Sequence, residues 1–110
     1  MTRNEIGDEG VEAMAASENS TTLTFLDFSA NKISDRGALA IASSPQFANL
    51  KTLDLYNNQI TTEGMKALLQ SKNLKSLEML ILVRNEIDFE KAQDLAKNQS
   101  LPNLKRLELE

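Results

Sequence analysis

The sequence contains no cysteine and no histidine among its 110 residues. Zinc sites built from these side chains are therefore excluded, as are thiol nucleophiles, histidine-based catalytic triads and disulfide frameworks. The N-terminal stretch MTRNEIGDEG has no apolar run, so we expect neither a signal peptide nor a membrane span. A chain without cysteine fits a reducing compartment, and we expect a cytoplasmic protein without a cofactor.

Acidic residues outnumber basic ones, 16 to 12, so the formal net charge is −4. The basic residues Lys72, Lys75, Lys105 and Arg106 are spread along the sequence. We therefore expect solvated charges rather than a nucleic-acid-binding face. Hydrophobic residues make up 41% of the chain, which is enough for a core, and the length is that of one domain.

What the sequence does contain is a repeat with a period of 27 residues. Rows beginning at residues 23, 50, 77 and 104 read LTFLDFSANKI, LKTLDLYNNQI, LEMLILVRNEI and LKRLELE. The pattern L-x-x-L-x-L/F-x-x-N-x-I returns at the same offset, with its asparagine at Asn31, Asn58 and Asn85 and one period earlier at Asn4. We expect partial first and last repeats without caps, and stacking of the units to bury the leucines in one continuous core.

The second half of each row has the features of a helix. Gly7, Ser34, Thr61 and Asp88 are of types that favour a helix N-cap, and acidic residues follow each of them, where they suit the helix dipole. Apolar residues then recur three and four apart. We predict helices starting near residues 8, 35, 62 and 89, and parallel strands near 25–28, 52–55, 79–82 and 106–109.

The asparagine stands where each predicted strand ends and the chain turns. A buried amide at this point needs hydrogen-bond partners. We expect stacked asparagine side chains to bond backbone groups of their own turn and of the adjacent turn.

The pattern L-x-x-L-x-L-x-x-N-x-I resembles the leucine-rich repeat family along the whole chain. The helical half, N-x-I-[G/S/T/D]-x-x-G-x-x-A, resembles the ribonuclease-inhibitor-like subclass, which also supplies the repeat regions of NOD-like receptors. The stretch Gly37-Ala38-Leu39-Ala40 is similar to the bacterial GALA proteins, which pair such repeats with an F-box. The resemblance implies an α/β fold: a right-handed solenoid, or horseshoe segment, with a concave parallel sheet and convex helices. It implies about four 27-residue repeats in a single domain over residues 1–110.

Three residues depart from the repeat. Lys91 stands where the helix glycine stands in the other rows, and Asp94 stands where the alanine stands. We therefore expect the last helix to pack differently or to face solvent more. Ser20 replaces the large apolar residue found at Phe47, Leu74 and Leu101, so we expect a looser first return loop.

The concave face supplies the candidate partner-binding residues. In this pattern the leucines point to the core, and the residues between them point out of the sheet. The candidates, with one arginine from the turn after the third strand, are Phe25, Asp27, Thr52, Asp54, Tyr56, Met79, Ile81, Val83, Arg84, Arg106 and Glu108. An apolar centre, nearby aromatic residues and a charged border are typical of a protein interface. The alternative is that β-propensity selected the apolar residues and that Leu-Asp-Leu is simply frequent in such strands.

Three functions compete on this evidence. The first is a non-catalytic module that binds a protein, for instance as the repeat region of an F-box-type or receptor-type effector. The second is an assembly element that self-associates through its uncapped stack ends. An enzyme is disfavoured, because Asp27 and Asp54 lie on an open sheet without a nucleophile or basic partner. A metal site is disfavoured too, because Glu108 lies two strands from Asp54.

Overall fold

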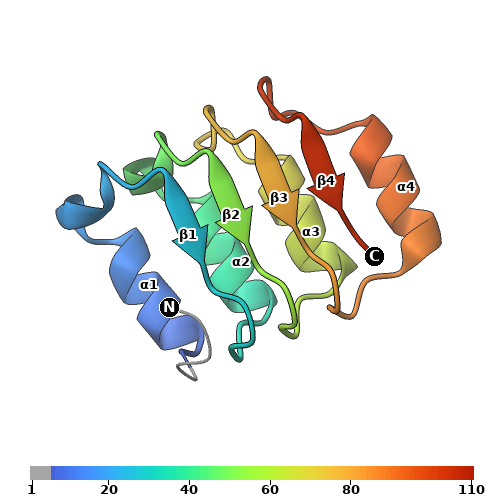
Figure 1. Ribbon diagram of the computed structural model, residues 1–110, viewed down its shortest axis with the longest axis horizontal. Helices are drawn as coiled ribbons and strands as arrows, with labels where there is room; N and C mark the ends of the chain where they lie inside the picture. Colours follow the sequence, from blue (N-terminus) through green and yellow to red (C-terminus); the bar gives the residue numbers. More distant parts are fainter. Residues whose placement is uncertain (1–5) are drawn as a thin grey trace.

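The structure, a computed structural model, describes residues 6–110. Helices and strands alternate along this part of the chain (Figure 1). The strands are β1 (Phe25–Asp27), β2 (Thr52–Asp54), β3 (Met79–Ile81) and β4 (Arg106–Glu108). The helices are α1 (Asp8–Ala15), α2 (Asp35–Ala42), α3 (Thr62–Leu69) and α4 (Phe89–Lys97), with short 3₁₀ helices η1 (Glu18–Ser20) and η2 (Pro45–Phe47). The predicted positions of all eight main elements are confirmed, the strands being one residue shorter.

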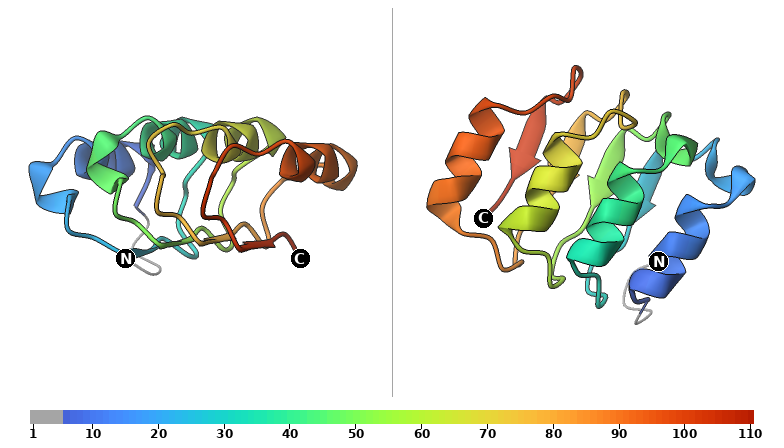
Figure 2. Two further views of the ribbon diagram at one scale, coloured as in Figure 1. Left: turned by 90° about the horizontal axis from the view of Figure 1, so that it is seen from above. Right: turned by 180° about the vertical axis from the view of Figure 1, so that it is seen from behind.

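The strands form one parallel sheet in the order β1-β2-β3-β4. Its register follows the repeat, since Phe25 pairs with Thr52, Thr52 with Met79, and Met79 with Arg106. All four helices lie on the same side of this sheet (Figure 2). Within residues 6–110, no helix covers the other side of the sheet, which we call the open face.

The core lies between the sheet and the helices. Leu26, Leu53 and Leu80, which form one register row, are each at most 5% exposed. The corresponding leucine of β4, Leu107, is only half-buried because no further strand lies beside it. The leucines therefore point inward, as the repeat predicted.

The asparagine ladder forms as expected. Asn58 is 7% exposed, and its Oδ1 accepts a hydrogen bond from the Ile33 backbone N–H of the preceding repeat. Its Nδ2 donates to the carbonyl oxygens of Phe28, Leu55 and Tyr56. The side chains of Asn31 and Asn85 make equivalent bonds, while Asn4 lies outside the described residues.

The helix N-caps also occur where the sequence places them. The side-chain oxygens of Ser34, Thr61 and Asp88 accept hydrogen bonds from backbone N–H groups of the first helical turn. Gly7 occupies the N-cap position of α1 without a side chain to contribute. Each cap satisfies one of the backbone donors that a helix start leaves without a partner inside the helix.

The first residues of α1, α2 and α3 also join neighbouring repeats. Asp8 Oδ1 accepts hydrogen bonds from the backbone N–H groups of Ser34 and Gly37, both at 2.9 Å. Asp35 accepts in the same way from the backbone N–H and the hydroxyl of Thr61. Acidic residues were expected here only for the helix dipole, whereas the structure uses two of them as links between helices.

These carboxylates occupy the space that a side chain at the helix glycine would need. A Cβ added to Gly37 would lie 2.5 Å from Asp8 Oδ1, and a Cβ added to Gly64 would lie 2.4 Å from Asp35 Oδ1. The next link uses the shorter side chain of Thr62, whose hydroxyl accepts a hydrogen bond from the Asp88 N–H. The residue at the glycine position of α4 is Lys91. The glycine is thus present where the neighbouring helix begins with aspartate and absent where it begins with threonine.

The residues that depart from the repeat affect α4 and the first return loop in different ways. Lys91 and Asp94 are exposed, so the prediction that α4 faces solvent more is confirmed. Ser20 is 4% exposed, and its hydroxyl donates a hydrogen bond to the Met14 carbonyl oxygen. The first return loop therefore closes through a hydrogen bond where the later loops use an apolar side chain. Within residues 6–110, the helices are too short and too polar to cross a bilayer.

Candidate functional site

The open face presents ordered rows of side chains from the four strands. One row contains Phe25, Thr52, Met79 and Arg106, and the next contains Asp27, Asp54, Ile81 and Glu108. Neighbouring members of a row are about 4.8 Å apart, because that is the spacing of hydrogen-bonded strands. The structure therefore brings these eight sequence-predicted residues together on one surface.

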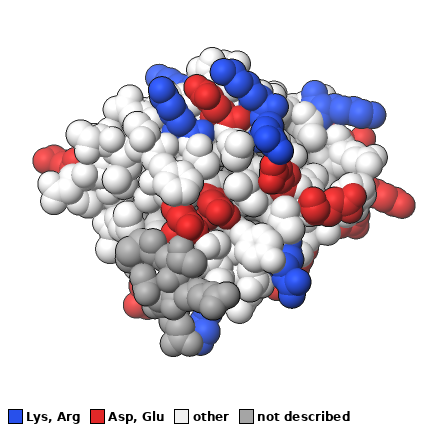
Figure 3. Space-filling model, in the orientation of Figure 1, with Lys and Arg blue, Asp and Glu red and all other residues white. Residues whose placement is uncertain are grey.

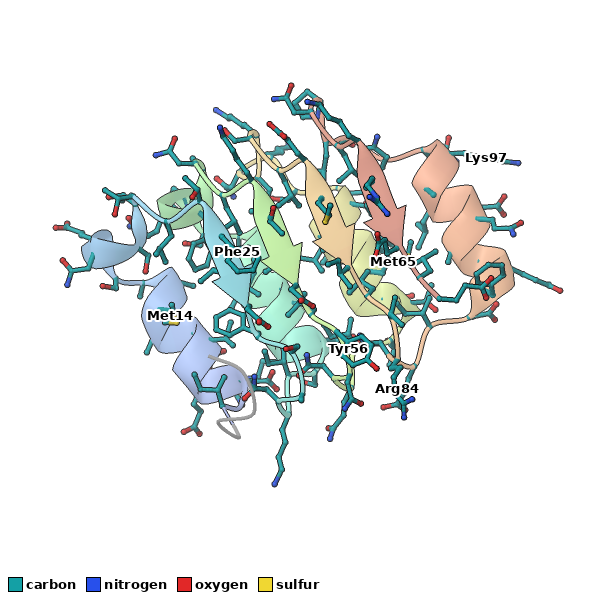
Figure 4. All side chains as sticks on the ribbon, in the orientation of Figure 1. Met14, Phe25, Tyr56, Met65, Arg84 and Lys97 are labelled. Carbon is teal, nitrogen blue, oxygen red and sulfur yellow. The ribbon has the colours of Figure 1, made fainter. Side chains whose placement is uncertain are left out.

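Aromatic side chains are the most exposed apolar groups of this face. Phe25 is 57% exposed and Tyr56 is 39% exposed. The sequence suggested Met79, Ile81 and Val83 as the apolar centre. These three side chains are half-buried and therefore less exposed than the two aromatic residues. Figure 4 shows Phe25 on β1 and Tyr56 just beyond the end of β2. The accessible apolar surface is therefore displaced from β3 toward β1 and β2.

Two carboxylates lie between these aromatic residues. Asp27 and Asp54 pair directly in the register of β1 and β2. Asp27 Oδ1 accepts hydrogen bonds from the backbone N–H and hydroxyl of Ser29, at 2.9 and 2.6 Å. Asp54 Oδ1 accepts one from the Tyr56 backbone N–H at 3.0 Å. Both side chains therefore help to shape the turn that follows their strand.

The surroundings of Asp54 disfavour its charge. Partial burial raises the pKa of its carboxyl above the ordinary value, and repulsion from Asp27 and Glu108 adds to this effect, while the Tyr56 N–H opposes it. The turn after β2 uses the Asp54 oxygen as an acceptor, a role that does not need a charge. In β3 the same register position is occupied by Ile81, which has no acceptor at all. The negative charge at Asp54 is therefore not explained by the fold.

We expect Asp54→Asn to raise the melting temperature at pH 7. The asparagine Oδ1 keeps the acceptor for the Tyr56 N–H and removes the disfavoured charge. Because the folded-state pKa is raised, the stabilising contribution of Asp54 is complete below its ordinary pKa of 3.8 and is lost as pH rises through the folded-state value. The gain from the substitution should be below about 1 kcal/mol, since solvent screens this partly exposed group.

Thermal melts of both proteins at pH 7 and pH 3 test this expectation. The advantage of Asp54→Asn should shrink at pH 3, where the wild-type carboxyl is protonated. Asp94→Asn, which changes an exposed carboxylate on α4, is the matched control and should show no such gain. A lower melting temperature for Asp54→Asn at pH 7 would show that the charge stabilises the fold.

Charged residues border the face on the β4 side. Arg106 Nη2 lies 2.7 Å from Glu108 Oε2, and Lys105 Nζ lies 3.7 Å from Glu78 Oε1. The backbone of Glu78 bonds to Lys51 on one side and to Lys105 on the other, so these three residues are neighbours. Figure 3 shows basic side chains gathered along the edge where the strands begin and acidic ones nearer the middle. Basic residues that are spread in sequence are thus brought to one edge by the repeat, which the sequence analysis did not foresee.

Arg84 lies apart from the other candidates. It is exposed in the turn after β3, where its backbone is left-handed with φ of 61°. Asn57 and Ala30 have the same conformation one and two repeats earlier, respectively. The conformation is therefore a property of the repeat, and Figure 4 shows Arg84 at the edge beyond the strand ends.

The acidic side chains of the described part of the chain do not gather into a metal site. No group of three or more Asp or Glu side chains within residues 6–110 is close enough to hold a metal ion. A separate hollow of about 530 Å³ lies beside β4, lined by Phe89, Leu107 and Leu109 with the charged Arg106, Glu108 and Glu110. Its apolar residues belong to the helix and strand at that end of the sheet.

Comparison with known families agrees with this geometry. The family model described as Leucine Rich repeats (2 copies) matches residues 21–67, and the one described as Leucine Rich repeat matches residues 1–15. Together the matched segments cover more than half of the 110 residues. The comparison with curated proteins gives no match. Together with the parallel strands and helices that return every 27 residues, these matches show that the chain contains leucine-rich repeats.

Proposed function

We propose that this chain is a non-catalytic protein-interaction module and that the open face of its sheet is the binding surface. Leucine-rich repeats generally mediate protein–protein interaction. The observation that carries the proposal is the exposure of Phe25 and Tyr56 on the same face as Asp27 and Asp54. Rigid aromatic side chains beside charged groups are typical of residues that dominate binding energy.

The same evidence supports a more detailed assignment. Each repeat of 27 residues contains an eight- or nine-residue helix opposite its strand, which supports the ribonuclease-inhibitor-like subclass. We infer a right-handed horseshoe segment of about four repeats forming one domain over residues 1–110. The open face is then the concave side, where the side chains of successive repeats converge on a partner.

Alanine substitution of Tyr56, Met79 and Ile81 together is expected to reduce capture of protein partners by the immobilised chain at least tenfold. Truncating these side chains removes apolar contact area from the open face and leaves the buried leucines in place. Proteins retained from a cell extract are quantified by mass spectrometry, and thermal melts check the fold of the variant.

Leu39→Ala is the matched control, because Leu39 is a 56% exposed apolar residue on α2, in the helix layer. The control should retain every partner that the wild-type chain retains. If the triple variant also retains them while remaining folded, the open face is not the binding surface.

A further inference from the structure

We propose that the open face binds a short, extended peptide segment whose arginine or lysine side chain lies over Asp27 and Asp54, between Phe25 and Tyr56. This inference rests on the proposed function and names the chemistry of the partner. The segment would also place an apolar side chain over β3, two residues away from its basic residue.

The negative charge of Asp54 indicates that the partner carries a positive charge. Among residues 6–110, no basic side chain forms an ion pair with Asp54. Its charged neighbours are Asp27 and Glu108, and the nearest arginine on the β4 side, Arg106, is already paired with Glu108. The position needs no charge for folding, since Ile81 occupies it in the next strand. A carboxylate that the fold does not require is complementary to a cation from outside.

The aromatic rings beside the carboxylates indicate which kind of cation fits. Phe25 is two residues before Asp27 on β1, and Tyr56 is two residues after Asp54, so all four side chains lie on the same face of the sheet. The carboxylate pair is therefore flanked by two exposed aromatic rings. Lysine and arginine suit this arrangement, because their apolar stems pack on rings while their charged ends reach carboxylates. A small inorganic cation would leave the aromatic surface unused.

Spacing identifies the second anchor. The midpoint of the Asp27–Asp54 pair lies about one and a half strand spacings, or roughly 7 Å, from β3. Two residues of an extended peptide span about 7 Å as well. A peptide crossing the strands would thus set an apolar side chain over Met79 and Ile81 when its basic side chain is over the carboxylates.

Size favours a short segment over a folded domain. Four strands span about 19 Å and three exposed positions per strand about 10 Å, which gives a few hundred square ångströms. A standard interface between folded proteins buries about 800 Å² on each partner. The open face of these repeats matches a few residues of extended chain.

Selection from a random twelve-residue peptide library displayed on phage tests the inference with the full chain as bait. Enriched peptides should contain arginine or lysine with an apolar residue two positions away. One enriched peptide is then synthesised with a fluorescent label, and its binding is measured by anisotropy. The double variant Asp27→Asn, Asp54→Asn should bind it at least tenfold more weakly, and Leu39→Ala should bind it as the wild type does.

A matched change in the peptide completes a double-mutant cycle. Replacing its basic residue with norleucine, which removes the charge and keeps the stem, should weaken binding to the wild type at least tenfold. It should have little further effect on the double variant, because the partner charge is already gone. Asparagine keeps the turn acceptor at both positions, so a melt within a few degrees of the wild type is expected for the variant.

Three other results of these experiments would overturn the inference, and they differ in what they mean for the proposed function. Peptides that depend on Tyr56, Met79 and Ile81 but carry no basic residue would overturn this inference and leave the proposed function standing. If no selected peptide responds to any open-face variant, both fail. If the bait forms dimers by light scattering, and the dimer competes with peptide for the open face, the occupant is a second copy of the chain and the inference is overturned.

Discussion

Replacing Gly64 with alanine is expected to lower the free energy of unfolding by about 2–4 kcal/mol, through overpacking and lost hydrogen bonds. The added Cβ would lie 2.4 Å from Asp35 Oδ1 and 2.7 Å from Ile60 Cγ2, which is too close for either atom to stay in place. Moving the Asp35 carboxylate breaks its bonds to the backbone N–H and hydroxyl of Thr61. Urea denaturation of both proteins measures the loss.

The sign of this effect separates the structural explanation from helix propensity. Alanine is favoured over glycine inside a helix by up to about 1 kcal/mol, so propensity alone predicts a stabilised protein. The matched control is Lys91→Ala, because Lys91 occupies the equivalent position of α4 and already has a side chain. That variant should remain within about 0.5 kcal/mol of the wild type, as surface changes usually do.

A second substitution tests whether the neighbouring carboxylate is the cause. Asp35→Thr reproduces the residue found at the same position of the next repeat, Thr62, which coexists with Lys91. The double variant Asp35→Thr, Gly64→Ala should therefore lose less than the sum of the two single losses. Additive losses, or an unchanged Gly64→Ala protein, would show that the carboxylate and the glycine are not coupled.

Asn58→Ala is expected to cost about 3 kcal/mol, since one buried backbone N–H loses its acceptor and several carbonyl oxygens each lose one of their donors. The Ile33 N–H loses its acceptor, and the carbonyl oxygens of Phe28 and Leu55 lose a donor. In a domain of this size such a loss lowers the melting temperature by more than about 10 °C. Circular-dichroism melts measure it.

Asn49→Ala provides the comparison for the ladder. Asn49 is an exposed asparagine with a single side-chain bond, to the Thr21 carbonyl oxygen, so its loss should stay below about 1 kcal/mol. Equal melting temperatures for the two variants would contradict the assignment of the Asn58 amide as a structural link. Asn58→Asp should lose at least as much stability as Asn58→Ala, because it would bury a carboxylate against the carbonyl oxygens to which the amide now donates.

The sequence predicted those features in which a residue has the same structural role in every repeat. The period of 27, the inward leucines such as Leu53 and the N-caps such as Ser34 follow from residue type and spacing, and the structure confirms them. The ladder of Asn58 was predicted for the same reason, because a buried amide at a turn has few other ways to find partners.

The links between the helices of neighbouring repeats were not predicted. The link from Asp8 to Gly37 joins residues 29 positions apart, and within one repeat each of them has a sufficient local explanation. Relative exposure on the open face also depends on the neighbouring strands. Met79 and Ile81 are flanked by side chains on both neighbouring strands, whereas Phe25 lies on the outermost strand, so the aromatic residue is the more accessible.

The pairing of aspartate with glycine limits how the units of this chain can be exchanged. Excising residues 35–61 would bring Asp8 opposite Gly64, a combination that the intact protein already uses at two junctions. Excising residues 62–88 would instead bring Asp35 opposite Lys91, whose side chain needs the space that the carboxylate fills. Repeats of equal length are therefore not freely interchangeable. A rearranged array keeps close packing between helices only where an aspartate at a helix start faces a glycine in the next helix.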